Sequence, residues 1–226
     1  MLRKNDRWLY VLLLVLIACR GSEKVDPSLD TRFKGSINIS ADESFKPVIE
    51  AQVKVYEASY SEAKLNVHYK AEADCLRDLT VDSVRLVIVP KWITEEERSF
   101  VADSMKVATE QMLLAYDAVA VIVNPNQEIT RFTLNDLKQI LQGNFRKNLI
   151  PVFDGLKATS TVRFIVDSVL RGDSLSKKTL AAKSSEEVVD YVSKNPDAVG
   201  FIGVSWIGNK DDEQQQSFLT KVRLAE

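Results

Sequence analysis

The chain has 226 residues, of which 45% are apolar and 27% charged, and its formal net charge is −2. This length allows one large domain or two small lobes. The slight negative charge excludes the strongly basic surface that nucleic-acid binding needs, so no nucleic-acid partner is expected. A single His, without Cys or carboxylate residues at ligand spacing, argues against a zinc site, and no cofactor is expected.

The N-terminus has the pattern of a bacterial secretion signal. Basic residues precede an apolar run at 9–17, which is too short to span a bilayer comfortably and ends close to Cys19. This order resembles a lipoprotein signal peptide, in which residues 1–18 are removed and Cys19 is lipidated. The resemblance implies a protein of the bacterial envelope that faces the periplasm and is anchored to the inner or outer membrane. A plain N-terminal anchor helix is the alternative.

The next stretches are a tether and the first structural element. Residues 19–34 are mostly polar and lack periodicity, which predicts a tether. Residues 36–50, SINISADESFKPVIE, change from the alternation of a strand to helical spacing at Phe45. A polar turn at this point aims backbone N–H groups at the crevice beside the strand end, which suits an anion. Ordinary capping of the helix by Asp42 or Ser44 explains the same residues.

Strands and helices then alternate along the chain, which predicts an α/β fold with a largely parallel sheet or sheets. Cys75 lies in an apparent helix and reads as a small buried apolar residue. Strands are expected at 65–69, 83–90, 117–125, 150–153, 198–206 and 218–224, and helices at 71–79, 94–116, 133–143, 162–170 and 184–192.

A second turn between strand and helix has the design of the first. The strand at 150–153 gives way to a Gly-containing turn and then to Thr159, Ser160 and Thr161 at a helix start. These hydroxyl groups, with Lys157 or Arg163 as cations, are suited to holding an anion against the first turn. Helix capping again explains the hydroxyl residues equally simply.

Several segments in this order resemble the phosphate-binding, PstS-type substrate-binding proteins of ABC importers, most closely their shorter lipoprotein relatives. The resemblance covers residues 35–226 and implies a two-lobed periplasmic-binding-protein type II fold with crossover hinge strands near 123–125 and 201–203. Lobe one would comprise 35–123 and 200–226, and lobe two 124–199. The segments that carry the resemblance are 37–50, 69–74, 115–125, 133–143, 151–155, 160–164 and 184–206.

The resemblance also implies a site and partners. The Ser44 hydroxyl and the Phe45 N–H would face the ligand from lobe one. A turn at 158–160, or one residue later, would face it from lobe two, which brings in Thr159, Ser160 and Thr161. The implied ligand is phosphate or a related oxyanion, the implied partner is an ABC permease, and a monomer is expected.

Some positions depart from the family pattern. The second helix start reads Lys-Ala-Glu-Ala-Asp at 70–74 in place of a Ser-Gly-rich turn. The Asp expected to accept a proton from phosphate falls on Val-Pro-Lys at 89–91, and the expected Arg falls near Asp154. Selectivity for phosphate over sulfate is therefore left open. The candidate replacements are Glu72 or Asp74 as acceptor and Lys91, Lys157 or Arg163 as cation; a solvated helix start explains Glu72 and Asp74 equally well.

Three functions are compatible with these features. The first is a lipid-anchored solute-binding protein that captures an oxyanion for ABC-type import. The second is a non-transport binding or sensor lipoprotein with an altered cleft on the same fold. The third, an envelope hydrolase, is disfavoured because the elbow-like run at 203–207 lacks its second Gly and the only His, His68, precedes Ser205. We therefore expect a binding protein and not an enzyme.

Overall fold

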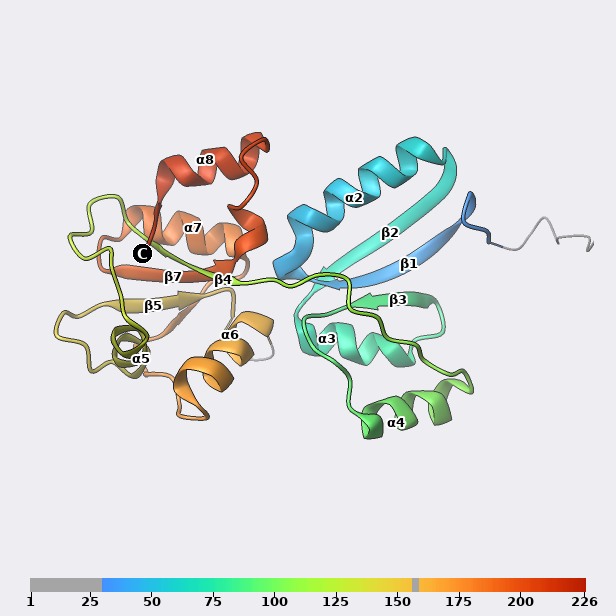
Figure 1. Cartoon of the computed structure of the whole chain (residues 1–226), viewed down its shortest axis with the longest axis horizontal. Coiled ribbons are helices and arrows are strands. Elements are labelled where there is room, and N and C mark those ends of the chain that lie inside the picture. The colour runs from blue at the N-terminus through green and yellow to red at the C-terminus, as the bar shows by residue number, and fades with distance from the viewer. Residues whose placement is uncertain (1–29, 156–158) are drawn as a thin grey trace, which may run out of the picture.

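Two α/β lobes lie side by side in the computed structural model of the chain (Figure 1). The structure describes residues 30–155 and 159–226. The predicted signal peptide, the lipidation site Cys19, most of the tether and Lys157 lie outside the described residues. Within the described part, the chain passes from lobe one to lobe two through segment 106–118.

Lobe one is built on a parallel three-stranded sheet of order β2-β1-β3. The central strand β1 is most buried at its C-terminal end, where Ala41 is 0% and Asp42 2% exposed. Because the strands are parallel, their carboxyl ends share one edge, and β1 therefore delivers Asp42 to an edge that faces lobe two. The elements are β1 (Lys34–Asp42), η1 (Glu43–Phe45), α2 (Lys46–Ser59), β2 (Glu62–Lys70), α3 (Glu72–Arg77), η2 (Asp78–Thr80), β3 (Val84–Ile88) and α4 (Glu95–Met105).

Lobe two is built on a mixed five-stranded sheet of order β6-β5-β7-β4-β8. Apolar clusters fill both faces, one under α7 and α8 and one under α5 and α6, and the rings of Phe153 and Phe201 stack 4.7 Å apart in the second. The elements are β4 (Val119–Val123), α5 (Leu134–Gln142), β5 (Ile150–Phe153), α6 (Ser160–Ile165), the π-helical η3 (Val166–Leu170), β6 (Leu180–Ala181), α7 (Ser185–Lys194), β7 (Ala198–Gly203), η4 (Val204–Trp206), α8 (Glu213–Lys221) and β8 (Arg223–Leu224).

The predicted helix caps are present. Thr94 and Glu97 form a reciprocal capping box at the start of α4. Thr133 begins α5 in the same way, and Gly143 ends that helix in the left-handed conformation. Ser184 accepts a hydrogen bond from the N–H of Glu187 at the start of α7. These contacts fix the helix starts from short-range sequence alone.

Two predicted elements differ from the structure. The helix expected to run to 116 ends at Met105, because Lys106 adopts a left-handed backbone with φ 56°, and the apolar residues that follow are left exposed. The strand expected at 218–224 is mostly the end of α8. Gln215 and Phe218 are both buried, and a spacing of three places them on one face of α8.

The lobe boundaries also differ from the expected division. Residues 200–226 were expected in lobe one, but β7 pairs with β4 and β5, and β8 pairs with β4. β7 lies between β5 and β4 inside this sheet, and all six of its residues are buried, as in a strand covered on both faces. The C-terminal segment therefore completes the sheet of lobe two.

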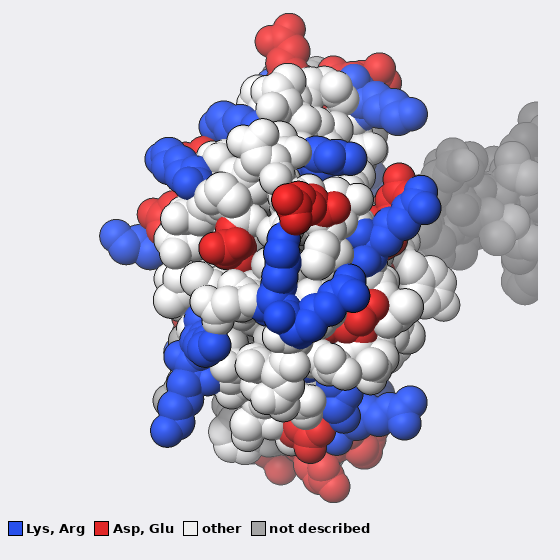
Figure 2. All heavy atoms as spheres, turned by 90° about the vertical axis from the view of Figure 1, so that its left-hand side faces the viewer, with Lys and Arg blue, Asp and Glu red and all other residues white. Residues whose placement is uncertain are grey.

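The outer end of lobe two is a mixed charged surface. Figure 2 shows Lys and Arg side chains interspersed with Asp and Glu side chains over this face, an arrangement typical of a solvated surface. No helix in the described part of the chain is both long and apolar enough to cross a membrane.

Gly200 provides a test of the packing in lobe two. A Cβ atom at this position would lie 2.7 Å from Ile122 and 2.8 Å from Val188 in the core. We expect Gly200→Ala to lower the free energy of unfolding by about 1–3 kcal/mol through overpacking. Urea denaturation measures the change, with Leu134→Ala on the exposed face of α5 as the control. Equal stability of both variants and the parent would contradict this packing.

Candidate functional site

The candidate site is where the carboxyl end of β1 meets the start of α6. The Oδ1 atom of Asp42 accepts hydrogen bonds from the Ser44 N–H over 3.0 Å and the Ser44 hydroxyl over 2.6 Å. It also accepts one from the Ser160 hydroxyl of lobe two over 2.9 Å. All three residues are buried. Donors from both lobes therefore converge on one carboxylate oxygen.

A second carboxyl group of lobe one reaches the start of α7. Glu43 accepts from the N–H of Ser185 over 3.2 Å and from its hydroxyl over 3.0 Å. Ser185 is the first residue of α7, where backbone N–H groups have no partner within the helix. A carboxylate is stabilised at this position by the helix dipole as well as by the hydrogen bonds.

A third carboxyl group makes an ion pair across the lobes. Arg163 of α6 donates from Nε to one Glu72 oxygen over 2.7 Å and from Nη2 to the other over 2.9 Å. Nη2 also donates to the carbonyl of Pro90 over 3.0 Å. Glu72 begins α3 and is 5% exposed, and its hydrogen bonds hold the pKa of Arg163 above its usual value.

Three carboxyl groups at this junction, those of Asp42, Glu43 and Asp154, have raised pKa values. Burial raises the pKa of Asp42 and of Glu43, while the Ser160 and Ser185 hydrogen bonds act in the opposite direction. Burial, together with the charges of Glu43 and Asp42, raises the pKa of Asp154 to about 7. Among the described atoms, Oδ1 of Asp154 and Oδ2 of Asp42 have no hydrogen-bond partner. Proton uptake is thus built into the site near neutral pH.

The structure brings together some of the predicted site residues. Ser44 and Ser160 face each other, with their hydroxyl oxygens 3.4 Å apart. Thr159 acts as the cap of α6, accepting from the Val162 N–H, and Thr161 is buried beside it. Phe45 is half-buried and ends η1. Ser44 and Ser160 therefore meet across the two lobes, and Phe45, Thr159 and Thr161 lie next to them along the chain.

The open alternatives for acceptor and cation are separated by their positions. Glu72 and Arg163 meet at the junction. Asp74 instead pairs with Arg77 on the exposed side of α3, and Lys91 pairs with Glu97 over 3.0 Å.

Sequence reasoning missed the roles of Glu43, Ser185 and Asp154. Ser185 and Glu43 are 142 positions apart, so no local pattern links them. The sequence marks Asp154 only as lying near the position where the family pattern has an Arg. Its place at the end of a buried strand, directly before the hydroxyl-rich turn, was the available signal.

The residues considered for a hydrolase are not brought together. The Ser205 hydroxyl donates to the carbonyl of Ser44, and His68 lies exposed on β2. A Cβ atom at Gly203 would lie 3.1 Å from that same Ser44 carbonyl, so this glycine allows the end of β7 to approach lobe one closely. Ser205 therefore positions the backbone of η1, the turn that follows β1.

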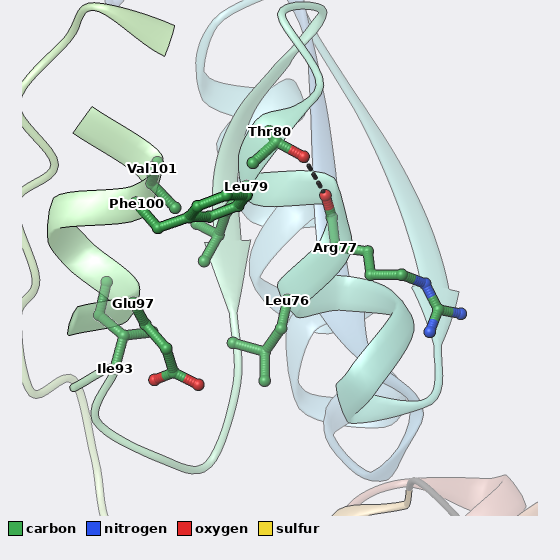
Figure 3. A pocket seen from close by; sticks show the side chains of 8 residues that line it. All are labelled: Leu76, Arg77, Leu79, Thr80, Ile93, Glu97, Phe100 and Val101. Carbon is green, nitrogen blue, oxygen red and sulfur yellow. Dashed lines mark hydrogen bonds between the residues drawn. The ribbon is translucent and has the colours of Figure 1, made fainter. Parts of the chain in front are cut away.

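A separate hollow of about 240 Å³ lies within lobe one between α3 and α4 (Figure 3). Its wall is mainly apolar, with Phe100 placed beside Val101 and Leu79. Its charged members have partners elsewhere, since Glu97 binds Lys91 and Arg77 binds Asp74. Neither Asp42 nor Ser160 lines the hollow, and we assign the candidate site to the place where β1 meets α6.

Comparison with known families identifies the fold. A family model for the PBP superfamily domain matches residues 24–224. The chain belongs to the PBP superfamily. No curated protein matches it. Within the described residues, no group of three or more His, Cys, Asp or Glu side chains is arranged to hold a metal ion.

Solved structures share this two-lobed PBP fold at low sequence identity. A candidate phosphate ABC transporter substrate-binding protein from Clostridium perfringens, solved with bound phosphate, has a TM-score of 0.68 at 16% identity, covering 85% of this chain and 75% of its own. An ABC-type phosphate transport receptor from Vibrio cholerae has a TM-score of 0.55 at 18% identity, covering 84% and 75%. The reduced regulatory domain of OxyR2 from Vibrio vulnificus has a TM-score of 0.61 at 12% identity, covering 89% and 84%.

Asp154 gives this PBP junction a testable pH dependence. With its pKa raised to about 7 from 3.8, the folded protein keeps a proton that the unfolded chain has lost. The stability that this proton contributes is full below about pH 4 and is lost as the pH rises through about 7. We expect Asp154→Asn to exceed the parent in unfolding free energy by about 1–2 kcal/mol at pH 8, and to match it at pH 4.

Urea denaturation at four pH values measures this difference. Exposed Asp211 offers a matched control, since Asp211→Asn removes a carboxylate without changing the junction. A difference between Asp154→Asn and the parent that stays constant from pH 4 to pH 8 would contradict the raised pKa.

Proposed function

We propose that the chain is a solute-binding protein that captures phosphate or a related oxyanion between its lobes. The observation that carries the proposal is the convergence of the Ser44 N–H and hydroxyl with the Ser160 hydroxyl on one anionic oxygen, that of Asp42. Donors arranged in this way bind the oxygen of a carboxylate and suit the oxygen of a phosphate equally well. The phosphate bound to the similar Clostridium perfringens protein supports the same class of ligand.

The proposal includes a transport role in the cell envelope. The fold shared with the ABC-type phosphate transport receptor from Vibrio cholerae supports delivery of the solute to an ABC permease. Anchoring through lipidated Cys19 would keep the protein beside that permease if the anchor lies in the inner membrane, and the signal pattern at residues 1–18 supports lipidation. Binding by lobe closure needs no catalytic group, in agreement with the separation of Ser205 from His68.

A second candidate function is a non-transport binding or sensor module. The observation in its favour is that Asp42, Glu43 and Glu72 already accept hydrogen bonds from the donors that an oxyanion would use. These carboxylates would also repel a fully ionised anion. A fold shared with the OxyR2 regulatory domain is compatible with this alternative.

Calorimetric titration of the phosphate-free protein separates the two functions. We expect phosphate to bind with micromolar or tighter affinity, and sulfate to bind more weakly at pH 8 than at pH 6. The pH effect follows because a proton on Asp154 removes a repulsive charge, and sulfate itself does not titrate in this range. Absence of heat with either ion, together with an unchanged melting temperature at high ligand concentration, would favour the non-transport module.

Ser160 tests the site within the same assay. We expect Ser160→Ala to weaken oxyanion binding by about 1–3 kcal/mol if its hydroxyl donates to the ion, and Thr161→Ala tests the neighbouring hydroxyl in the same way. Thr220→Ala is the matched control, because that hydroxyl bonds the carbonyl of Ser217 on the exposed face of α8. Unchanged affinity in both site variants would contradict the assignment of these hydroxyls.

A further inference from the structure

An ion pair joins the two lobes directly. Glu72 lies at the start of α3 in lobe one and Arg163 lies in α6 of lobe two, 91 positions along the chain. Two parallel hydrogen bonds of 2.7 and 2.9 Å connect the guanidinium with the carboxylate. This bidentate geometry is among the strongest contacts between Arg and a carboxylate.

The surroundings make this pair costly to break. The Glu72 side chain is 7% exposed and that of Arg163 37%. Arg163 Nη2 also bonds the carbonyl of Pro90 on lobe one, and Nη1 lies 3.7 Å from Asp167. Removing Arg163 would leave Glu72 as a buried charge without compensation. Both the Nε and the Nη2 donors of Arg163 are directed at oxygens of lobe one.

We propose that Glu72 and Arg163 form a latch that closes the lobes without a solute, with Glu72 as the competitor that any anion must displace from Arg163. A carboxylate and an oxyanion need the same donors of the guanidinium, so both cannot hold them at once. The apparent affinity for an anion falls in proportion to the fraction of molecules in the unlatched state. Glu72 therefore determines how strongly a solute must bind in order to enter the cleft.

The latch is distinct from the other contacts between the lobes. Asp42 and Glu43 accept from neutral Ser160 and Ser185, so their contacts contain no opposite charge. Glu72 and Arg163 alone of these contacts can be reversed in sign and still attract each other. The latch itself goes beyond the proposed function, whereas competition by Glu72 rests on an oxyanion as the solute.

Charge reversal tests the latch in the absence of any ligand. Small-angle X-ray scattering of the purified protein measures its radius of gyration. Glu72→Arg places two guanidinium groups together and Arg163→Glu places two carboxylates together, so each single variant should repel at the junction and have a larger radius than the parent. The double variant restores an opposite pair, and its radius should return towards that of the parent.

The control and the contrary outcomes are defined by the same measurement. Arg131→Glu reverses a charge in the exposed pair with Glu226, which lies within lobe two, and should leave the radius unchanged. Equal radii for the parent and both single variants would overturn the latch, as would a double variant as expanded as the singles. If circular dichroism shows that a reversed variant is unfolded, Glu72→Gln decides: a larger radius supports the latch and an unchanged radius overturns it.

Ligand binding separates failure of the latch from failure of the proposed function. Glu72→Gln frees Arg163 from its competitor, and we expect it to bind phosphate or sulfate about tenfold more tightly than the parent, within the usual range of coupling between sites. Weaker or equal binding would overturn competition by Glu72. If neither the parent nor the variant binds an oxyanion, the proposed function fails, and scattering alone still decides whether the lobes are latched.

Discussion

The arrangement of the two lobes depends on one buried carboxylate. Asp42 ends the central strand of lobe one, caps the turn that follows and accepts a hydrogen bond from lobe two. A buried carboxylate is tolerated only when hydrogen bonds replace its lost hydration. Ser44 and Ser160 supply those bonds to Oδ1 from opposite lobes, so Asp42 keeps hydrogen-bond donors when the lobes meet and exclude water. Fold and site are therefore fixed by the same atoms.

The junction is short of positive charge. Asp42, Glu43, Glu72 and Asp154 lie around it, and Arg163 is shared between Glu72 and the Pro90 carbonyl. The protein compensates in two ways, by directing neutral donors at Asp42 and Glu43 and by keeping a proton on Asp154 up to about neutral pH. Under the proposed function, an oxyanion entering this place would replace a carboxylate as the hydrogen-bond acceptor, so capture would be an exchange of one anion for another.

Local sequence signals predicted most elements but not how they meet. The Thr94 and Thr133 capping boxes act over three residues, which is why these helix starts could be predicted. The end of α4 could not be predicted, because Lys106 adopts a left-handed backbone and a Lys residue gives no sequence signal for that conformation. Ser44 and Ser160 were predicted as site residues, whereas the partners of Glu43 and Glu72 lie 142 and 91 positions away. Such pairings are decided by tertiary packing.

Carboxylates that already accept hydrogen bonds from these donors do not by themselves argue against a binding function. The protein's own carboxylates and an external anion compete for the same donors. The free energy of this exchange decides which one is bound, because the donors keep their hydrogen bonds and only the acceptor changes. Closing an empty cleft would leave buried donors unpaired, and the carboxylates avoid that cost. Under the proposed function, an incoming anion would displace these carboxylates and would contact both lobes at once. The balance depends on the free-energy cost of protonating Asp154 and of releasing Glu72 from Arg163.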